Sequence, residues 1–246
     1  MFKVMILGWR KIGKTIKLMD SEGNGLAVVE VKGVHLPLFP LVESNINNYD
    51  KFHARGDDVW IVNWPKSGTH WVYEVVRLLM TGREELTDSI KEGTMFPEAC
   101  AVESLEKLPS PRILDTHVPL KLFPEEALKK SKIIYTLRNP KDAFVSGYHH
   151  RKNLKGGTSY CGTWNGYFDL TIDENACVYG SWFDHVADWM EVLENTPMLC
   201  SGYGKPEERG IVGDWKNHFT VAQNKKSNAI FNEKRNKLRV SVDFEL

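Results

Sequence analysis

Residues 59–71 read Val-Trp-Ile-Val-Asn-Trp-Pro-Lys-Ser-Gly-Thr-His-Trp, and this stretch decides the fold. The compact apolar run at 59–63 is typical of a buried strand. Turn-forming residues follow at 65–69, and apolar residues then recur at helical spacing over 71–79, with Gly82 suited to the helix end. The stretch therefore predicts a buried strand that leads through a short loop into a helix.

The same order of strand and helix recurs downstream. Residues 112–117 predict a short strand, and 124–130 predict a helix with Pro at its start and acidic residues in its first turn. Residues 132–137 predict another strand, after which Asn139 suits an N-cap and Pro140 a first helical position. Alternating strands and helices indicate an α/β fold with a central parallel sheet flanked by helices.

The segments around this core are less regular. The first forty residues predict a short strand, a loop, a second β-rich piece at 26–31 and a turn with prolines. Ser181 suits the N-cap of an amphipathic helix that Pro197 ends. Because the 246 residues contain no internal repeat or low-complexity linker, we expect a single domain over residues 1–246.

Composition narrows the classes of partner. Lys+Arg and Asp+Glu number 32 each, so no overall basic field points to nucleic acid or to a membrane surface. The four cysteines are scattered without a C-x-x-C spacing, which argues against a zinc site and a disulfide framework. No signal peptide or membrane-spanning run stands out. We therefore expect a cytoplasmic protein, with no nucleic acid, membrane or metal as partner.

The loop at 65–69 has residues that suit phosphate binding. Ligands of parallel α/β sheets lie beyond the carboxyl ends of the strands, where loops lead into helix N-termini. Gly68 lets the backbone approach an anion closely, Lys66 adds a positive charge, and Ser67 and Thr69 add hydroxyl groups. The same Pro and Gly would serve equally well to shape an ordinary turn, and a motif this short leaves both interpretations open.

Four segments together resemble the cytosolic sulfotransferase family. PKSGTHW at 65–71 resembles its 5′-phosphosulfate loop, and LDTHVP at 114–119 resembles the segment that carries a catalytic histidine. IYTLRNPKDAFVS at 134–146 is similar to its 3′-phosphate strand and helix, and RGIVGDWK at 209–216 to its closing Gly-rich loop. The four matches follow the family's order. They imply a sulfotransferase fold, which is similar to that of P-loop NTPases.

The resemblance implies an enzyme that moves a sulfuryl group from 3′-phosphoadenosine 5′-phosphosulfate (PAPS) to a hydroxyl or amine of a small lipophilic acceptor. It implies two catalytic residues, His117 as general base and Lys66 as the cation that neutralises the leaving oxygen. The residues implied for nucleotide binding offer backbone N–H groups, hydroxyls, cations or a flat ring. They are Lys66, Ser67, Gly68, Thr69, His70, Trp71, Arg138, Ser146, Arg209 and Gly210.

Particular roles follow for three of these residues. Arg138 can direct two donors at the terminal 3′-phosphate, a geometry that Lys cannot copy, and Ser146 adds a hydroxyl from the same helix. Trp71 offers a flat face to the adenine, although a large aromatic residue would also suit the core. No metal is needed in this scheme, because Lys and helix N-termini carry the charge stabilisation.

The acceptor site is less defined by the sequence. The loop at 92–97 and the side chains of Phe144, Tyr148 and His149 are expected to help line an apolar pocket. Packing in the core or at the surface is the alternative for each of them. The identity of the acceptor does not follow from these residues.

Three positions depart from the family's pattern. Asp115 stands where the family usually has Lys, and Glu208 takes the place of a cation in the closing loop. Residues 216–225 resemble a short homodimer motif, but Lys225 replaces its terminal Glu. Asp115 is expected to lower the rate of sulfuryl transfer, and Glu208 to weaken binding of the 3′-phosphate. Lys225 is expected to weaken the dimer contact.

The chain is also shorter than the family's pattern between about residues 200 and 208. Family members carry a further sheet strand and several helices there, including a Tyr and a Thr that contact the adenine side of the nucleotide. A catalytically weak or inactive nucleotide-binding variant of the family is therefore the alternative function. The loss of a strand predicts an exposed apolar sheet edge or helix face.

A second phosphate motif gives a remote alternative, a P-loop ATPase or kinase. Residues Gly8–Thr15 satisfy the pattern G-x-x-x-x-G-K-[ST], with a strand expected at 3–7 before them. Such a loop leads into a helix, but residues 16–20 run directly into Ser-Glu-Gly-Asn-Gly, which leaves too little room for one. No later strand ending in an Asp for Mg²⁺ stands out.

Overall fold

The structure, a computed structural model of the chain, describes residues 14–82, 96–193, 199–202 and 213–238. Its strands are β1 (Thr15–Met19), β2 (Gly25–Val31), β3 (Val34–Pro37), β4 (Val59–Val62), β5 (Ile113–Thr116), β6 (Lys132–Leu137) and β7 (Leu199–Gly202). Its α-helices are α1 (Val42–Asn47), α2 (Thr69–Thr81), α3 (Val102–Glu106), α4 (Glu125–Lys130), α5 (Pro140–Asn153), α6 (Trp164–Ile172), α7 (Trp182–Leu193) and α8 (Val221–Lys234). Short 3₁₀ turns are η1 (Tyr49–Lys51), η3 (Pro97–Ala99), η4 (Leu120–Leu122), η5 (Gly156–Thr158), η6 (Asp214–Asn217) and η7 (Arg235–Lys237).

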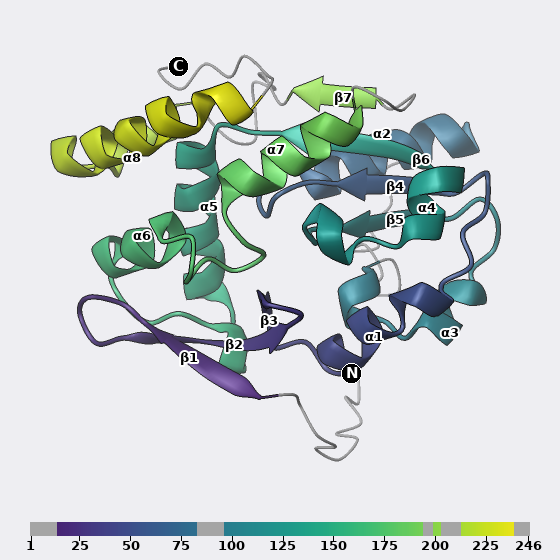
Figure 1. Cartoon of the computed structure of the whole chain (residues 1–246), viewed down its shortest axis with the longest axis horizontal. Coiled ribbons are helices and arrows are strands. Elements are labelled where there is room, and N and C mark those ends of the chain that lie inside the picture. Colours follow the sequence, from purple (N-terminus) through teal and green to yellow (C-terminus); the bar gives the residue numbers. More distant parts are fainter. Residues whose placement is uncertain (1–13, 83–95, 194–198, 203–212, 239–246) are drawn as a thin grey trace.

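A parallel sheet with the strand order β5-β4-β6-β7 forms the centre of the fold (Figure 1). Val62, at the end of β4, pairs with Thr116 of β5 on one side and with Tyr135 of β6 on the other. Parallel strands in this register end at the same edge of the sheet, so the loops that follow β4, β5 and β6 leave the sheet together. The predicted α/β fold with a central parallel sheet is confirmed.

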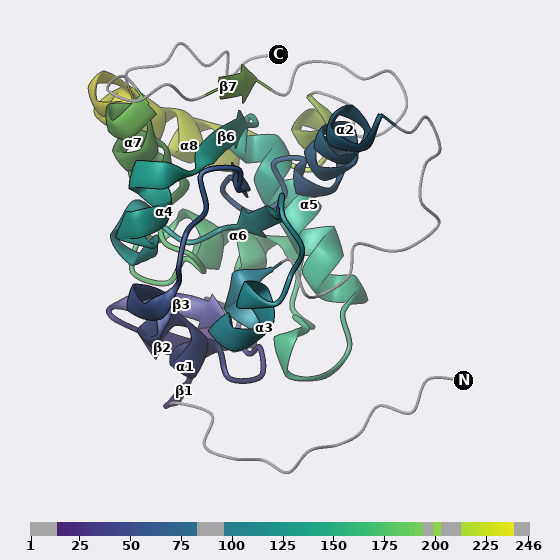
Figure 2. The same ribbon diagram turned by 90° about the vertical axis from the view of Figure 1, so that its right-hand side faces the viewer.

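Helices cover both faces of the sheet, with α2 on one side and α4 and α7 on the other (Figure 2). Successive residues of a strand point to opposite faces. Trp60 of β4 packs edge-on to Phe123, which in turn contacts Trp189 of α7. Its neighbour Ile61 packs on the opposite face, in a cluster with Tyr73 of α2. Burial on both sides explains why the whole of β4 is apolar.

The local signals for helix ends are confirmed where the structure describes them. Gly82 ends α2 in the left-handed conformation at φ 63°, as a glycine C-cap does. The side chain of Asn139 accepts a hydrogen bond from the backbone N–H of Lys141 at 2.9 Å and caps α5. The Ser181 hydroxyl accepts one from the N–H of Phe183 at the start of α7. Pro197 lies outside the described residues.

The strands β1, β2 and β3 form a separate antiparallel sheet (Figure 1). Thr15, the last residue of the second phosphate motif, begins β1 and pairs with Val29 of β2. The chain therefore continues from that motif as a strand, where a P-loop requires a helix. This strand contradicts the ATPase or kinase alternative; residues 3–7 and 8–13 lie outside the described residues.

The edge strand β7 was not predicted from the sequence. It pairs parallel with β6, with Leu199 opposite Ile134. In the described residues it is the last strand of the sheet.

Two further features concern the described residues as a whole. Cys100, Cys161 and Cys177 are free thiols there, and none of the described helices combines the length and apolar character that a membrane crossing needs.

Candidate active site

Three loops at one edge of the parallel sheet carry the predicted site residues. The loop after β4 contains Lys66 to Thr69, the loop after β5 contains His117, and the loop after β6 contains Arg138. Because β4 lies between β5 and β6, its loop is the central one of the three. The sheet topology therefore brings together residues that lie up to about 70 positions apart in the sequence, as the contacts below show.

The loop at 65–69 has an unusual backbone. Gly68 is the N-cap residue of α2 at φ 98°, in the left-handed region that glycine adopts without cost. Lys66 also has a positive φ, 69°, a conformation that costs an ordinary L-residue about 1 kcal/mol. Strain of this kind persists where the surrounding contacts fix the loop, and it is frequent at functional sites.

Side chains from the neighbouring strands fix this loop. Arg138 donates from Nη1 to the backbone oxygen of Lys66 at 2.8 Å, and the Thr136 hydroxyl donates to the backbone oxygen of Ser67 at 3.2 Å. The Thr69 hydroxyl donates to Oδ1 of Asn63 at 2.9 Å. The ends of β4 and β6 therefore hold both sides of the loop, although Asn63 and Thr136 were not singled out in the sequence.

The loop presents polar groups and positive charge that suit an anion. Partial burial, followed by the nearby charge of Arg138, lowers the pKa of Lys66. The Ser67 side chain is 1% exposed, and its hydroxyl has no hydrogen-bond partner within the described residues. A buried donor without a partner is costly, so this hydroxyl would gain a hydrogen bond from a bound anion. The residues present therefore fit the phosphate end of a nucleotide.

His117 is oriented by contacts on two sides. Its ring Nδ1 lies 2.9 Å from the backbone oxygen of Asn63, and its backbone N–H donates to Oε1 of Glu98 at 2.8 Å. A carbonyl oxygen only accepts hydrogen bonds, so Nδ1 must carry the proton in the neutral ring. Nε2 then has the lone pair, which is the form that a general base requires.

Aromatic rings flank this imidazole. The ring centroids of Phe96 and Tyr179 lie 5.4 and 5.5 Å from that of His117, both in edge-on arrangements. Phe96 belongs to the loop that was expected to line an acceptor pocket, of which residues 92–95 lie outside the described residues. Tyr179 precedes α7 and was missed, because nothing in its sequence neighbourhood signals a place next to His117.

The other residues proposed for the acceptor pocket lie elsewhere in the packing. Phe144 is 1% exposed and packs against Trp64, and Tyr148 packs in a second cluster with Tyr167. His149 contacts the ring of His218 at a centroid distance of 5.2 Å. Core packing, the alternative kept open for Phe144 and Tyr148, accounts for their positions.

The first turns of α2 and α5 complete this edge of the sheet. His70 is exposed, and Trp71 is 54% exposed, so Trp71 does not pack in the core. Ser146 is half-buried on α5. Partial burial and the nearby charge of Lys66 lower the pKa of His150 to about 4, which indicates that the His150 ring is close to the phosphate loop.

The described part of the Gly-rich segment is attached to the start of α5. Asp142 accepts hydrogen bonds from the backbone N–H groups of Gly213 at 3.0 Å and of Trp215 at 3.1 Å. The ammonium group of Lys141 lies 4.1 Å from the centroid of the Trp215 ring. Arg209 and Gly210 lie outside the described residues, so their predicted roles are not tested by the structure.

Asp115, one of the three positions that depart from the family's pattern, is 2% exposed within β5. Its negative charge contributes to raising the pKa of Glu98, an effect that is dominated by burial. Asp115 therefore lies near the buried Glu98. Glu208 lies outside the described residues.

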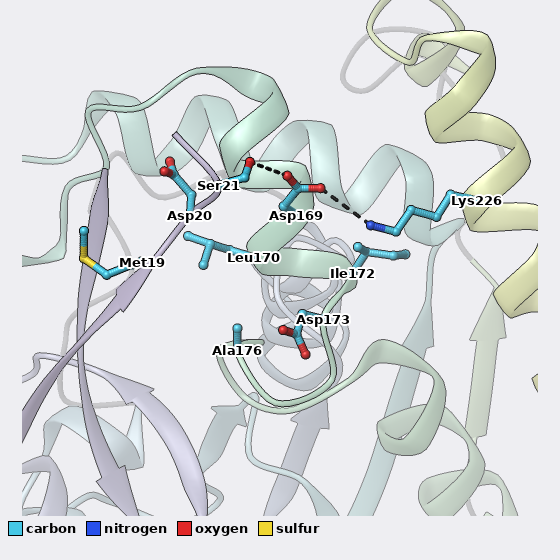
Figure 3. Close-up of a pocket in the computed structure, with 9 residues that line it drawn as sticks. All are labelled: Met19, Asp20, Ser21, Asp169, Leu170, Ile172, Asp173, Ala176 and Lys226. Atoms are coloured by element: carbon cyan, nitrogen blue, oxygen red, sulfur yellow. Dashed lines mark hydrogen bonds and ion pairs between the residues drawn. The ribbon is translucent and has the colours of Figure 1, made fainter. Parts of the chain in front are cut away.

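A cavity of about 550 Å³ opens between the turn after β1, α6 and α8 (Figure 3). Asp169 in its wall accepts a hydrogen bond from Ser21 at 2.6 Å and lies 3.6 Å from the ammonium group of Lys226. None of the residues that line it belongs to the three loops described above. The loops at the sheet edge, rather than this cavity, carry the predicted chemistry.

Fold and site together define a group-transfer enzyme of the α/β class. A family model described as "Sulfotransferase domain" matches residues 56–205, more than half of the chain. The chain therefore belongs to the sulfotransferase family.

Curated relatives agree with this assignment. Sulfotransferase 1B1 of Canis lupus familiaris is 30% identical over 274 aligned positions, which cover 82% of this chain and 91% of that protein. The 3-beta-hydroxysteroid sulfotransferase of Cavia porcellus is 30% identical over 75% of this chain and 86% of its own length. The alignment with the canine protein is longer than the 246-residue chain, so that relative has residues that this chain lacks.

Solved structures show the same fold. Mouse sulfotransferase SULT7A1 complexed with PAP superimposes with a TM-score of 0.70 at 25% identity, over 87% of this chain and 96% of that one. Retinol dehydratase in complex with androsterone and the inactive cofactor PAP has a TM-score of 0.69 over 93% of this chain. At 15% identity, the second likeness concerns the fold alone.

Proposed function

We propose that this chain transfers a sulfuryl group from PAPS to a hydroxyl or amine of a small lipophilic acceptor. The observation that carries the proposal is the meeting of two groups at one sheet edge. One is the loop after β4, with Lys66 and a Ser67 hydroxyl that has no partner among the described residues, held by Arg138 from the loop after β6. The other is His117, held in the tautomer of a base. The PAP in the mouse SULT7A1 structure supports a 3′-phosphorylated adenine nucleotide as donor.

In this proposal the residues of the loop hold the 5′-phosphate. The backbone N–H groups of Ser67, Gly68, Thr69 and His70 lie at the N-terminus of α2, where the helix dipole favours negative charge. Ser67 adds its hydroxyl, whereas the Thr69 hydroxyl donates to Asn63 and supports the loop. PAPS supplies the activated sulfuryl group. Lys66 stabilises the negative charge that forms on the bridging oxygen when its bond to sulfur breaks.

The other end of the nucleotide is assigned to α5 and the Gly-rich segment. Arg138 and Ser146 bind the 3′-phosphate, with Arg209 and Gly210 closing over it. Trp71, being exposed beside the loop, is available to stack on the adenine. The attachment of Gly213 and Trp215 to Asp142 supports a position of this segment next to Arg138.

His117 activates the acceptor in this scheme. Its Nε2 takes the proton from the acceptor hydroxyl or amine while the acceptor atom forms its bond to sulfur, a contribution typically worth ~10²–10⁴-fold in rate. The aromatic rings of Phe96 and Tyr179 beside His117 support a lipophilic acceptor. The name of the Cavia porcellus relative supports a hydroxysteroid as one acceptor to test.

The alternative is a nucleotide-binding variant with weak or no turnover. Asp115 in place of the family's Lys, Glu208, and the shortened segment at about 200–208 favour it. We treat residues 1–246 as a single shortened sulfotransferase domain and expect it in the cytoplasm. A homodimer through residues 216–225 stays a prediction, weakened by Lys225.

A sulfation assay tests the proposal. The protein is incubated with ³⁵S-labelled PAPS and a panel of phenols, hydroxysteroids and amines, and labelled product is measured for the unmodified chain, His117→Gln and the surface control His53→Gln. We expect product with the unmodified chain and the control, and at least roughly a hundredfold less with His117→Gln at unchanged affinity for PAP. Tight PAP binding without product would support the inactive variant, and no preference for PAP over AMP would refute both.

A further inference from the structure

The backbone of His117 is held on both sides by buried side chains that the mechanism above does not use. Its N–H donates to Glu98, and its C=O lies 3.2 Å from Nε2 of His185. His185 comes from α7, is 2% exposed and lies 68 positions further along the chain. The contact therefore joins a core helix to the end of β5, where the predicted base is located.

The protonation of His185 follows from its surroundings. Burial lowers the pKa of its imidazole to about 4, so the ring is neutral at physiological pH. The carbonyl oxygen of His117 only accepts, so Nε2 of His185 carries the proton and donates it. Nδ1 then accepts from the hydroxyl of Tyr135, 2.9 Å away on β6. A chain of donors therefore runs from Tyr135 through His185 to His117.

These contacts fix the direction in which the His117 side chain leaves the backbone. Fixing both the N–H and the C=O of a residue fixes the two peptide planes next to its Cα, and with them the direction of its Cα–Cβ bond. The ring of His117 then reaches the oxygen of Asn63 through Nδ1. A displacement of about 1 Å at a reacting group can cost roughly 10²-fold in rate.

We propose that His185 is a positioning residue for His117, with the Tyr135 hydroxyl setting the His185 tautomer. The inference rests on the proposed role of His117 as general base. The two nitrogens of His185 link the Tyr135 hydroxyl to the backbone of His117, the residue that carries the proposed base. A purely structural role would show in stability alone, whereas a positioning role acts on kcat and on the His117 ring.

The test compares His185→Phe, which removes both hydrogen bonds, with His185→Gln, whose amide can still donate to the His117 oxygen. Both variants are assayed for kcat, KM and PAP affinity by calorimetry. We expect His185→Phe to lower kcat by about 10- to 100-fold with the Kd for PAP within roughly twofold of the original. His185→Gln should recover most of the loss.

A second pair covers the case in which His185→Phe does not fold. Tyr135→Phe removes the hydroxyl that contacts His185, and Tyr160→Phe removes a buried hydroxyl that contacts Asp20, outside the site. Tyr135→Phe should lower kcat several-fold, whereas Tyr160→Phe should leave kcat unchanged. Equal effects of the two changes, or equal losses of kcat and PAP affinity, would overturn the proposal.

The tautomer of His117 gives a readout that needs no turnover. In ¹⁵N NMR spectra, assigned with His117→Gln, the unmodified chain should show the Nδ1-protonated ring, and His185→Phe should show a mixture of tautomers. If the unmodified chain turns over no acceptor, the proposed function fails, and the NMR comparison still decides the inference. An unchanged His117 tautomer in a folded His185→Phe protein would refute it.

Discussion

The Nδ1 atom of His117 lies 2.9 Å from the backbone oxygen of Asn63, the residue that directly follows β4. The side chain of the same Asn63 accepts the Thr69 hydroxyl at the first residue of α2. One residue therefore orients the proposed base with its backbone and holds the proposed phosphate loop with its side chain. The distance between donor loop and base is fixed by the pairing of β4 with β5.

Removal of the Asn63–Thr69 contact should weaken nucleotide binding. Thr69→Val deletes the hydroxyl that donates to Asn63, at a cost of about 1 kcal/mol, which corresponds to roughly a fivefold rise in the Kd for PAP. Thr69→Ser keeps the hydroxyl and should bind nearly as the original does. Calorimetric titration with PAP measures both. Equal Kd values for the two variants would argue against a role for this contact.

Arg138 should supply the preference for a 3′-phosphate. The unmodified chain is expected to bind PAP more tightly than AMP, and Arg138→Ala should reduce that preference by roughly 10- to 100-fold, because charged hydrogen bonds to phosphate contribute about 1.5–3 kcal/mol. Added salt should weaken PAP binding in the original more than in the variant. Lys129→Ala, which removes an exposed cation on α4, is the control. A preference for PAP that survives Arg138→Ala would contradict the assignment.

Glu98 should make the folded protein less stable as pH rises. Burial raises the pKa of Glu98 to about 8, so the folded state keeps a proton that the unfolded chain releases near pH 4.5. The stability that this proton contributes is present at acidic pH and is lost as pH rises towards 8, by at most about 1.4 kcal/mol per pH unit.

Glu98→Gln tests this dependence, because the amide oxygen can still accept from Thr116 and from the N–H of His117. Urea unfolding at pH 5 and pH 8 should show that the advantage of Glu98→Gln over the original grows with pH. The exposed change Glu103→Gln should produce no such trend. A difference between Glu98→Gln and the original that is the same at both pH values would show that Glu98 is ionised in the fold.

Asp142 should hold the Gly-rich segment in place for the nucleotide. Asp142→Ala removes the acceptor for two backbone N–H groups, and we expect faster hydrogen exchange at Gly213 and Trp215 together with weaker PAP binding. Asp214→Ala, a change in the same turn, leaves both bonds intact and is the matched control. Exchange rates that do not differ between the two variants would contradict the tethering role.

The strand, loop and helix at 59–82 could be predicted from the sequence because their signals are local. Apolar runs, Gly82 and Asn139 each act within one turn or one strand, and the structure places them as expected. Strand β1 has a weak signal, since it is only five residues long and only Ile16 and Leu18 are partly buried. It is held by its hairpin pairing with β2, and strand propensity depends too much on such context to identify so short a strand from its own residues.

The residues behind His117 could not be predicted for a different reason. Glu98, Tyr179 and His185 lie far from His117 in the chain, and each acts through a contact that exists only after the sheet and α7 have packed. His185 on the apolar face of a helix looks like any core residue in the sequence. Lys141 and Asp142 lie within a quoted motif, but their partners in the Gly213–Trp215 turn and in α8 are set by tertiary structure.

A crystal structure with PAP bound tests the central claim most directly. We predict the 5′-phosphate within hydrogen-bond distance of the backbone N–H groups at the loop of Lys66 to His70, and the 3′-phosphate on Arg138. PAP bound in the cavity beside Asp169 and Lys226, or bound with its 3′-phosphate away from Arg138, would contradict the account (Figure 3).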